Sequence, residues 1–185
     1  MAENDNLFDP QEIFTNVVQI GIVVRDLDQT LRGLTEIFGM GPFRIVEWPP
    51  PDRGDWARTY YGQPAEFTAR MAFADLGSVE IELIQPVAGS SIWADFLREH
   101  GGGIHHIRFN TFDLAPVEAY LAGQGIGTAQ NGLGIRSGTR WTNFDSVGQI
   151  GFIIEVMQAL RGTSGRTPAS ADGDAITSPG RSSAA

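Results

Sequence analysis

Four polar residues lie inside apolar, strand-like segments, and their spacing suggests that they belong together. Gln19 and His106 each precede an apolar run and are 87 residues apart, while Glu82 and Glu155 each lie between apolar residues and are 73 apart. An imidazole, an amide and two carboxylates at one point offer metal ligands and a group that accepts a proton. The sequence therefore indicates metal binding and proton transfer, provided that the fold brings the four residues together.

The elements that must position these residues occur in two similar sets. Each half of the chain reads as strand, helix, strand, strand, strand, with apolar β-branched runs as first strands and helical spacing of leucines after them. Repeats that cannot close a core alone pack against each other, so we expect an α+β fold of two tandem βαβββ modules. The expected parts are a flexible arm (1–14), a single domain (15–161) and a disordered tail (162–185). Within the domain we expect module one (15–88), a linker helix (89–101) and module two (102–161).

Side-chain alternation and one unusual loop refine this picture. In a regular strand His105 points away from His106 and packs in the core, whereas Glu80 shares the face of Glu82 as a rim residue. The segment 49–64 is too rich in proline for a central strand and too aromatic for a solvated linker. We expect it to fold over the site, with Trp56 and Tyr60 covering a pocket.

Composition excludes several classes of function. The chain has 185 residues, a formal charge of −9 and no cysteine, and all 13 of its basic residues are arginine. An acidic surface repels nucleic acid and anionic lipid, and the missing residues rule out lysine Schiff bases and thiolate sites. No apolar stretch is long enough to span a membrane and no signal peptide is visible, so we expect a cytoplasmic protein.

The pattern Gln19, Glu82, His106 and Glu155 resembles that of the vicinal oxygen chelate superfamily, also called the glyoxalase/bleomycin-resistance/extradiol dioxygenase fold. The resemblance spans residues 17–158, and the segments 91–106 and 138–144 are most similar to methylmalonyl-CoA epimerase. The resemblance implies that the two modules form a cupped mixed sheet. Gln19 stands where that epimerase has histidine, but some glyoxalase I enzymes carry a glutamine ligand there.

The resemblance also implies roles for individual residues. Gln19, Glu82, His106 and Glu155 would bind one divalent metal ion (Zn, Co, Ni, Mn, Fe or Mg), and Glu155 would also act as the base of an isomerase, epimerase or lyase. Glu66 is the candidate second base, because Ala69 stands where the epimerase has an acidic residue. The substrate would be a small organic molecule or a CoA thioester, and many relatives are homodimers. The candidate substrate-binding residues are Arg140, Trp56, Tyr60 and Arg108.

Several alternatives stay open at this stage. The two glutamates could be exposed strand residues, His106 could be a hydrogen-bonded core residue, and Gln19 could mark a site that has lost its metal. The protein could then be a metal-free ligand-binding protein of the bleomycin-resistance type. An extradiol-type dioxygenase is a further alternative, but its usual set of two histidines and one glutamate does not accommodate Gln19.

Overall fold

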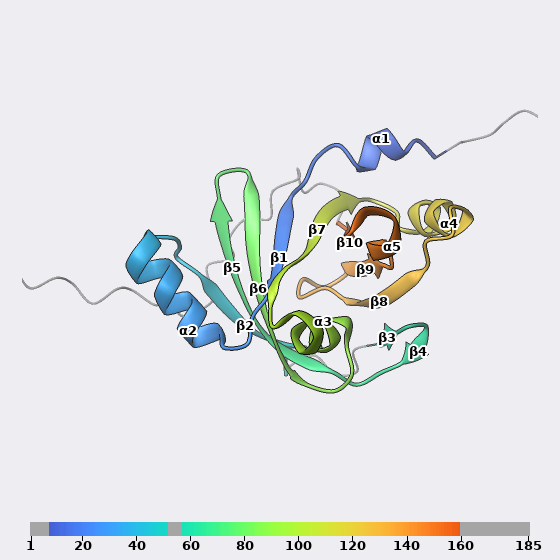
Figure 1. The fold of residues 1–185 in the computed structure, drawn as a ribbon. Helices are drawn as coiled ribbons and strands as arrows, with labels where there is room; N and C mark the ends of the chain where they lie inside the picture. The colour runs from blue at the N-terminus through green and yellow to red at the C-terminus, as the bar shows by residue number, and fades with distance from the viewer. Residues whose placement is uncertain (1–7, 52–56, 160–185) are drawn as a thin grey trace, which may run out of the picture.

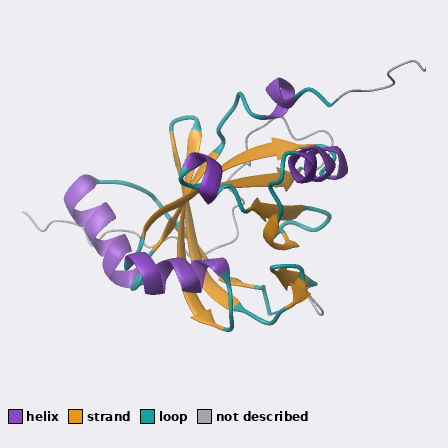
Figure 2. Cartoon of the chain, turned by 45° about the vertical axis from the view of Figure 1, so that its right-hand side comes forward, coloured by secondary structure: helices purple, strands orange, loops and turns teal. Residues whose placement is uncertain are grey.

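The centre of the fold is a pair of antiparallel strands, β1 (Gln19–Val23) and β7 (Gly103–Thr111), which come from the two apolar runs of the sequence. The computed structural model describes residues 8–51 and 57–159 (Figure 1). The described strands form one ten-stranded mixed sheet in the order β2-β5-β6-β1-β7-β10-β9-β8-β3-β4. In Figures 1 and 2 this sheet curls into an open half-barrel. The prediction of a cupped sheet is therefore confirmed.

The two modules occupy the two halves of the sheet. Module one consists of β1, α2 (Leu27–Arg32) with the π-helical turn η1 (Gly33–Ile37), β2 (Arg44–Trp48), β5 (Thr68–Leu76) and β6 (Val79–Ala88). Module two consists of β7, α4 (Ala115–Gly123), β8 (Thr128–Leu133), β9 (Arg140–Phe144) and β10 (Ile153–Gln158), with a short helix α5 (Val147–Ile150) before β10. The linker α3 (Ile92–His100) joins them. None of the described helices is long and apolar enough to cross a membrane.

Strand alternation sorts the side chains into two faces. On the outer face α2 packs its leucines against Ala72, Ala74 and Leu83, and α4 packs against β7, β9 and β10 around Phe109 and Phe144. On the inner face an aromatic cluster fills part of the cup. Its rings are those of Trp48, Phe67, Trp93 and Trp141, with centroids 5.3 to 5.8 Å apart.

The predicted cover segment carries a strand hairpin that crosses between the modules. β3 (Arg58–Tyr60) and β4 (Gln63–Pro64) belong to the chain of module one, yet β3 pairs antiparallel with β8 of module two. The hydroxyl of Tyr60 donates to Asp95 of α3, which fixes the hairpin to the linker. Trp56 lies outside the described residues, as does the tail predicted to be disordered (162–185).

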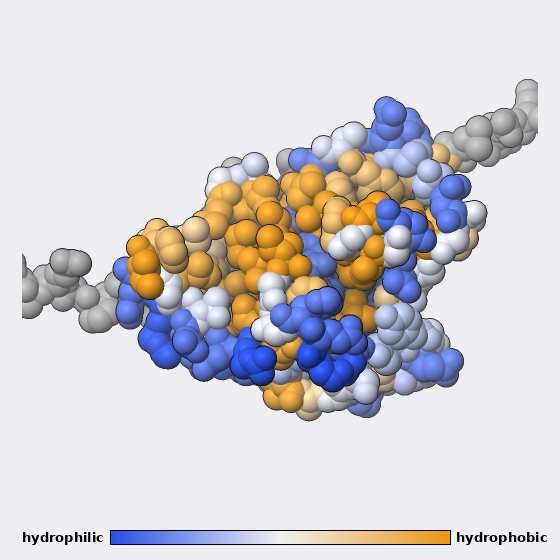
Figure 3. All heavy atoms as spheres, viewed as in Figure 1, coloured by the Kyte–Doolittle hydropathy of each residue, from blue (hydrophilic) through white to orange (hydrophobic). Residues whose placement is uncertain are grey.

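Two local features differ from the sequence predictions. The helix after β1 ends in a π-helical turn, which rotates Ile37 and Phe38 away from the core and leaves them 75% and 67% exposed. This turn carries the apolar surface at the left edge of Figure 3. The arm predicted as flexible over 1–14 is folded from residue 8, because α1 (Pro10–Ile13) and its flanking Phe8 and Phe14 pack on the core of module two.

Candidate active site

The register of the sheet relates the four polar residues by an approximate twofold. In module one Gln19 is opposite Glu80 and Gly21 is opposite Glu82. In module two His106 is opposite Ile153 and Arg108 is opposite Glu155. Because β1 and β7 pair with Gly21 opposite His106 and Gln19 opposite Arg108, Gln19 corresponds to His106 and Glu82 to Glu155. All four of these side chains lie on the inner face and are buried.

His106 lies at the centre of this cluster. Its Nε2 is 3.4 Å from a carboxylate oxygen of Glu82 and 3.5 Å from one of Glu155, and it has no hydrogen-bond partner among the described residues. Glu155 in turn accepts a hydrogen bond of 3.1 Å from Nδ2 of Asn143, which lies opposite it in β9. Carboxylates from both modules therefore face one imidazole.

Space for the imidazole comes from Gly21. A β-carbon at Gly21 would overlap the ring of His106. The ring thus lies directly over the backbone of the neighbouring strand, which a side chain at residue 21 would prevent. At the corresponding place in module two stands Arg108, so the equivalent space beside Gln19 is filled.

A β-bulge overturns the prediction for His105. Gly21 pairs with His106 and Ile22 pairs with Ile104, so His105 is the extra residue and does not point to the outer face. Its Nδ1 lies 3.0 Å from Nδ1 of His106, and its ring packs edge-on against Phe96 of α3. His105 is therefore both a packed residue, as predicted, and a direct neighbour of the cluster.

Burial and charge shift the pKa values of this cluster in different directions. Burial, followed by the charge of His106, holds the pKa of His105 well below its usual 6.5. Burial would also lower the pKa of His106, but the carboxylates of Glu155 and Glu82 raise it above 6.5 overall. Burial raises the pKa of Glu155, although His106 opposes the shift.

Gln19 is turned toward the rim of the cup. Its Nε2 donates a hydrogen bond of 2.7 Å to Glu80, and its Oε1 has no partner among the described residues. Glu80 also accepts from Arg108, and burial raises the pKa of the Glu80 carboxyl. As placed, therefore, no group of three or more His, Asp or Glu side chains within residues 8–51 and 57–159 is arranged to hold a metal ion.

The chemistry of the donors nevertheless fits a divalent cation. Two buried carboxylates, an imidazole nitrogen and an amide oxygen face the same inner surface, and the last two lack hydrogen-bond partners in the described chain. Buried polar atoms are rarely left unpaired without a reason. A cation would pair with these atoms and also offset the repulsion between Glu82 and Glu155.

Other predicted site residues lie elsewhere. Glu66 is exposed and forms an ion pair with Arg58, so the structure does not bring it to the cluster. Arg140 pairs with Glu118 of α4 at 3.2 Å, because alternation in β9 turns Arg140 outward and Asn143 inward. Tyr60 packs at the edge of the aromatic cluster. Sequence reasoning missed Asn143 and Gly21; their only signal was their register with Glu155 and His106.

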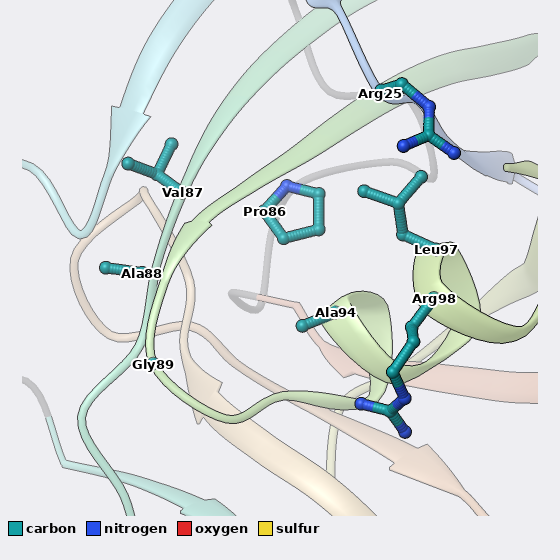
Figure 4. A pocket seen from close by; sticks show the side chains of 8 residues that line it. All are labelled: Arg25, Pro86, Val87, Ala88, Gly89, Ala94, Leu97 and Arg98. Atoms are coloured by element: carbon teal, nitrogen blue, oxygen red, sulfur yellow. The ribbon is translucent and has the colours of Figure 1, made fainter. Parts of the chain in front are cut away.

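A separate cavity of about 500 Å³ lies between the end of β6 and α3 (Figure 4). Its apolar wall includes Pro86 and Leu97, with Arg25 and Arg98 at two sides of them in the figure. The cavity shares no residue with the cluster around His106.

The sequence matches the Glyoxalase/Bleomycin resistance protein/Dioxygenase superfamily over residues 18–144. The protein belongs to this superfamily. The match begins just before β1 and ends at the last residue of β9, so it covers both central strands and most of each module. The name of the superfamily covers both enzymes and a resistance protein, so membership does not determine which reaction, if any, the protein catalyses.

Solved structures share this superfamily fold at low sequence identity. Methylmalonyl-CoA epimerase from Mycobacterium tuberculosis is 23% identical, with a TM-score of 0.54 over 77% of this chain and 87% of that one. A variant of the Streptomyces coelicolor epimerase in complex with 2-nitronate-propionyl-CoA is 21% identical, with a TM-score of 0.54 over 77% and 96%. A hypothetical protein from Bacillus halodurans is 17% identical, with a TM-score of 0.56 over 80% and 97%. No curated protein matches the chain.

Proposed function

We propose that the protein is a metal-dependent isomerase or epimerase that removes a proton from a carbon beside a carbonyl group. The observation that carries this proposal is the buried cluster in which Glu82 and Glu155, from different modules, face Nε2 of His106. The likeness in fold to methylmalonyl-CoA epimerases supports this choice of reaction class over a lyase or a dioxygenase.

Gln19, Glu82, His106 and Glu155 would hold the divalent ion, one of Zn, Co, Ni, Mn, Fe or Mg. Such an ion, when bound, withdraws electron density from a substrate carbonyl and stabilises the negative charge of an enolate. Gln19 would give up its hydrogen bond to Glu80 and bind the ion through its own Oε1, which has no partner among the described residues. The burial of all four side chains keeps water out and strengthens the electrostatic interactions between them.

Glu155 is the proposed base. Its carboxylate takes the proton, the C–H electron pair moves into the carbonyl group as an enolate, and the proton then returns to carbon from the same carboxyl or from a second acid. The hydrogen bond from Asn143 fixes the orientation of Glu155, and burial brings its proton affinity closer to that of a carbon acid. The structure does not supply Glu66 for the return step. Glu82 of β6 faces the same imidazole from the other module and would take that place.

Metal content and proton exchange test this function. Purified protein should contain stoichiometric divalent metal, which Glu82→Ala and His106→Ala should remove. With a carbonyl compound in D₂O, Glu155→Gln should slow exchange at the adjacent carbon by roughly 10²- to 10⁴-fold. The exposed Glu99→Gln variant is the matched control and should exchange like the unaltered protein. Exchange that survives Glu155→Gln would remove Glu155 from this role.

The second candidate is a metal-free ligand-binding protein, which the hydrogen bond between Gln19 and Glu80 favours. In that case the protein would bind its ligand without metal and with equal affinity in the Glu82→Ala and His106→Ala variants. Oxygen consumption by iron-loaded protein with catechols would instead support a dioxygenase.

A further inference from the structure

The guanidinium of Arg108 lies buried in the cup, and part of its hydrogen-bonding capacity is unused within the described chain. The residue is 5% exposed and its side chain extends from the same face of β7 as His106. Within the described chain it makes one hydrogen bond, from Nη2 to Glu80 at 3.3 Å, and its buried Nε has no partner. A buried guanidinium normally pairs fully, because a buried donor without a partner loses its hydrogen bonds to water and gains none in return.

The unpaired edge has the geometry of an oxyanion site. Nε and Nη2 of an arginine point in parallel and together bind the two oxygens of a carboxylate. Glu80 accepts from only one of these two groups of Arg108, Nη2, through a long hydrogen bond, and it also accepts from Gln19. The two groups, Nε and Nη2, form the fork of the arginine. A carboxylate on a ligand would satisfy Nε and complete the fork.

The position of Arg108 limits which part of a ligand it can reach. It is two residues from His106 on one strand, a separation of about 7 Å along the strand. It is also directly opposite Glu155, the proposed base. An anionic group bound by Arg108 therefore lies within a few bonds of the carbon that loses its proton. The phosphates of a CoA tail are too far from a thioester carbonyl to fill this place.

We propose that Arg108 binds a carboxylate close to the reacting carbonyl, so that the substrates are carbonyl compounds with a free carboxylate. This inference rests on the proposed function for the identity of the reacting carbon. The carboxylate binds beside the cluster and leaves Glu82, His106 and Glu155 free to act. Neutral carbonyl compounds of equal size would bind poorly, because they leave the guanidinium unpaired.

Calorimetric titration with 2-oxobutyrate and its neutral amide, 2-oxobutyramide, tests the inference. The protein should bind the acid at least tenfold more tightly than the amide. Arg108→Gln should abolish that preference. Arg108→Lys keeps the charge without the fork and should retain part of it. Arg140→Gln, a change of the same type on the outer face, should keep it in full.

Three outcomes would overturn the inference: no preference for the acid, an equal preference in Arg108→Gln, or an equal loss in Arg140→Gln. Thermal unfolding of each variant separates a binding effect from misfolding, and Arg108→Lys preserves the ion pair with Glu80 if the glutamine variant is unstable. Proton exchange at C3 of 2-oxobutyrate separates the two proposals. A preference that depends on Arg108 without exchange would uphold this inference and reject the isomerase function, whereas exchange without the preference would do the reverse.

Discussion

At the scale of single residues, the site depends on an unequal pair of positions. Gly21 and Arg108 correspond under the approximate twofold, yet one provides space and the other fills it. The ring of His106 lies over Gly21, while Gln19 has Arg108 beside it and turns to Glu80. The two halves of the site therefore differ in chemistry despite their common fold. The imidazole of His106 lies beside Gly21 in one half, and the guanidinium of Arg108 lies beside Gln19 in the other.

Substitution of Gly21 by alanine should damage the site directly. The added methyl group would overlap the imidazole, so His106 must leave its place between Glu82 and Glu155. We expect a loss of about 1–3 kcal/mol in the free energy of unfolding and loss of metal binding, measured by urea unfolding and metal analysis. Gly33→Ala is the control, since a β-carbon there meets no atom within 4 Å. Metal binding that persists in Gly21→Ala would contradict this view of His106.

Sequence patterns predicted the residues of the cluster better than their contacts. The repeat was enough to group Glu82, His106 and Glu155, because the parallel pairings of β1 with β6 and of β7 with β10 are regular at these residues. The bulge at His105 had a signal that the prediction overlooked, because His105 and His106 are two consecutive polar residues between Ile104 and Ile107 and interrupt the alternation. The choice of Glu80 as the partner of Gln19 depends on register between strands, which no single strand encodes.

At the scale of elements, the hairpin β3–β4 determines how the aromatic end of the cup is closed. Arg58 lies over the rings of Trp48 and Phe67, with distances of 5.7 and 5.5 Å to the ring centroids. The sequence predicted a folded cover from its prolines and aromatic residues. It could not predict pairing with β8, because the partner strand lies about 70 residues away and no local pattern specifies it.

The bond between Tyr60 and Asp95 makes a pH-dependent contribution to stability. The hydrogen bond to the Asp95 carboxylate, aided by burial, raises the pKa of Tyr60 from 10 to about 12. A pKa raised in the folded state stabilises the protein fully below pH 10, and this contribution is lost as the pH rises through 12. Unfolding free energies measured between pH 8 and 12 should therefore fall less steeply in Tyr60→Phe than in the unaltered protein.

The control for this experiment is Tyr120→Phe, which alters a tyrosine that packs on Phe8 at the outer face. It should keep the pH dependence of the unaltered protein. Equal slopes in all three proteins would show that the hydroxyl of Tyr60 does not tie the hairpin to α3.

At the scale of the whole molecule, the proposed metal ligands come equally from both modules, Gln19 and Glu82 from one and His106 and Glu155 from the other. A bound ion would therefore link the two halves and stabilise the entire sheet. A divalent metal at 100 times its dissociation constant should raise the free energy of unfolding by about 2.7 kcal/mol, and EDTA should reverse the effect. Thermal unfolding measures both changes.

Glu82→Ala should abolish this stabilisation, while Glu47→Ala, an exposed glutamate on β2, should leave it intact. An equal stabilisation in Glu82→Ala would place the metal elsewhere on the molecule. The expected homodimer stays a prediction, which light scattering of the same samples would test.

The pairing of β3 with β8 has a consequence for how such a duplicated protein could be divided. If the chain were cut in the linker before α3, the first fragment would retain the β3–β4 hairpin, which pairs with the edge strand β8 of the second fragment. Two copies of the second fragment would lack this hairpin, so β8 would have no β3 to pair with. The first fragment would bind the second in the one orientation that pairs β3 with β8. The pairing of β3 with β8 therefore favours association of unlike halves over association of like halves.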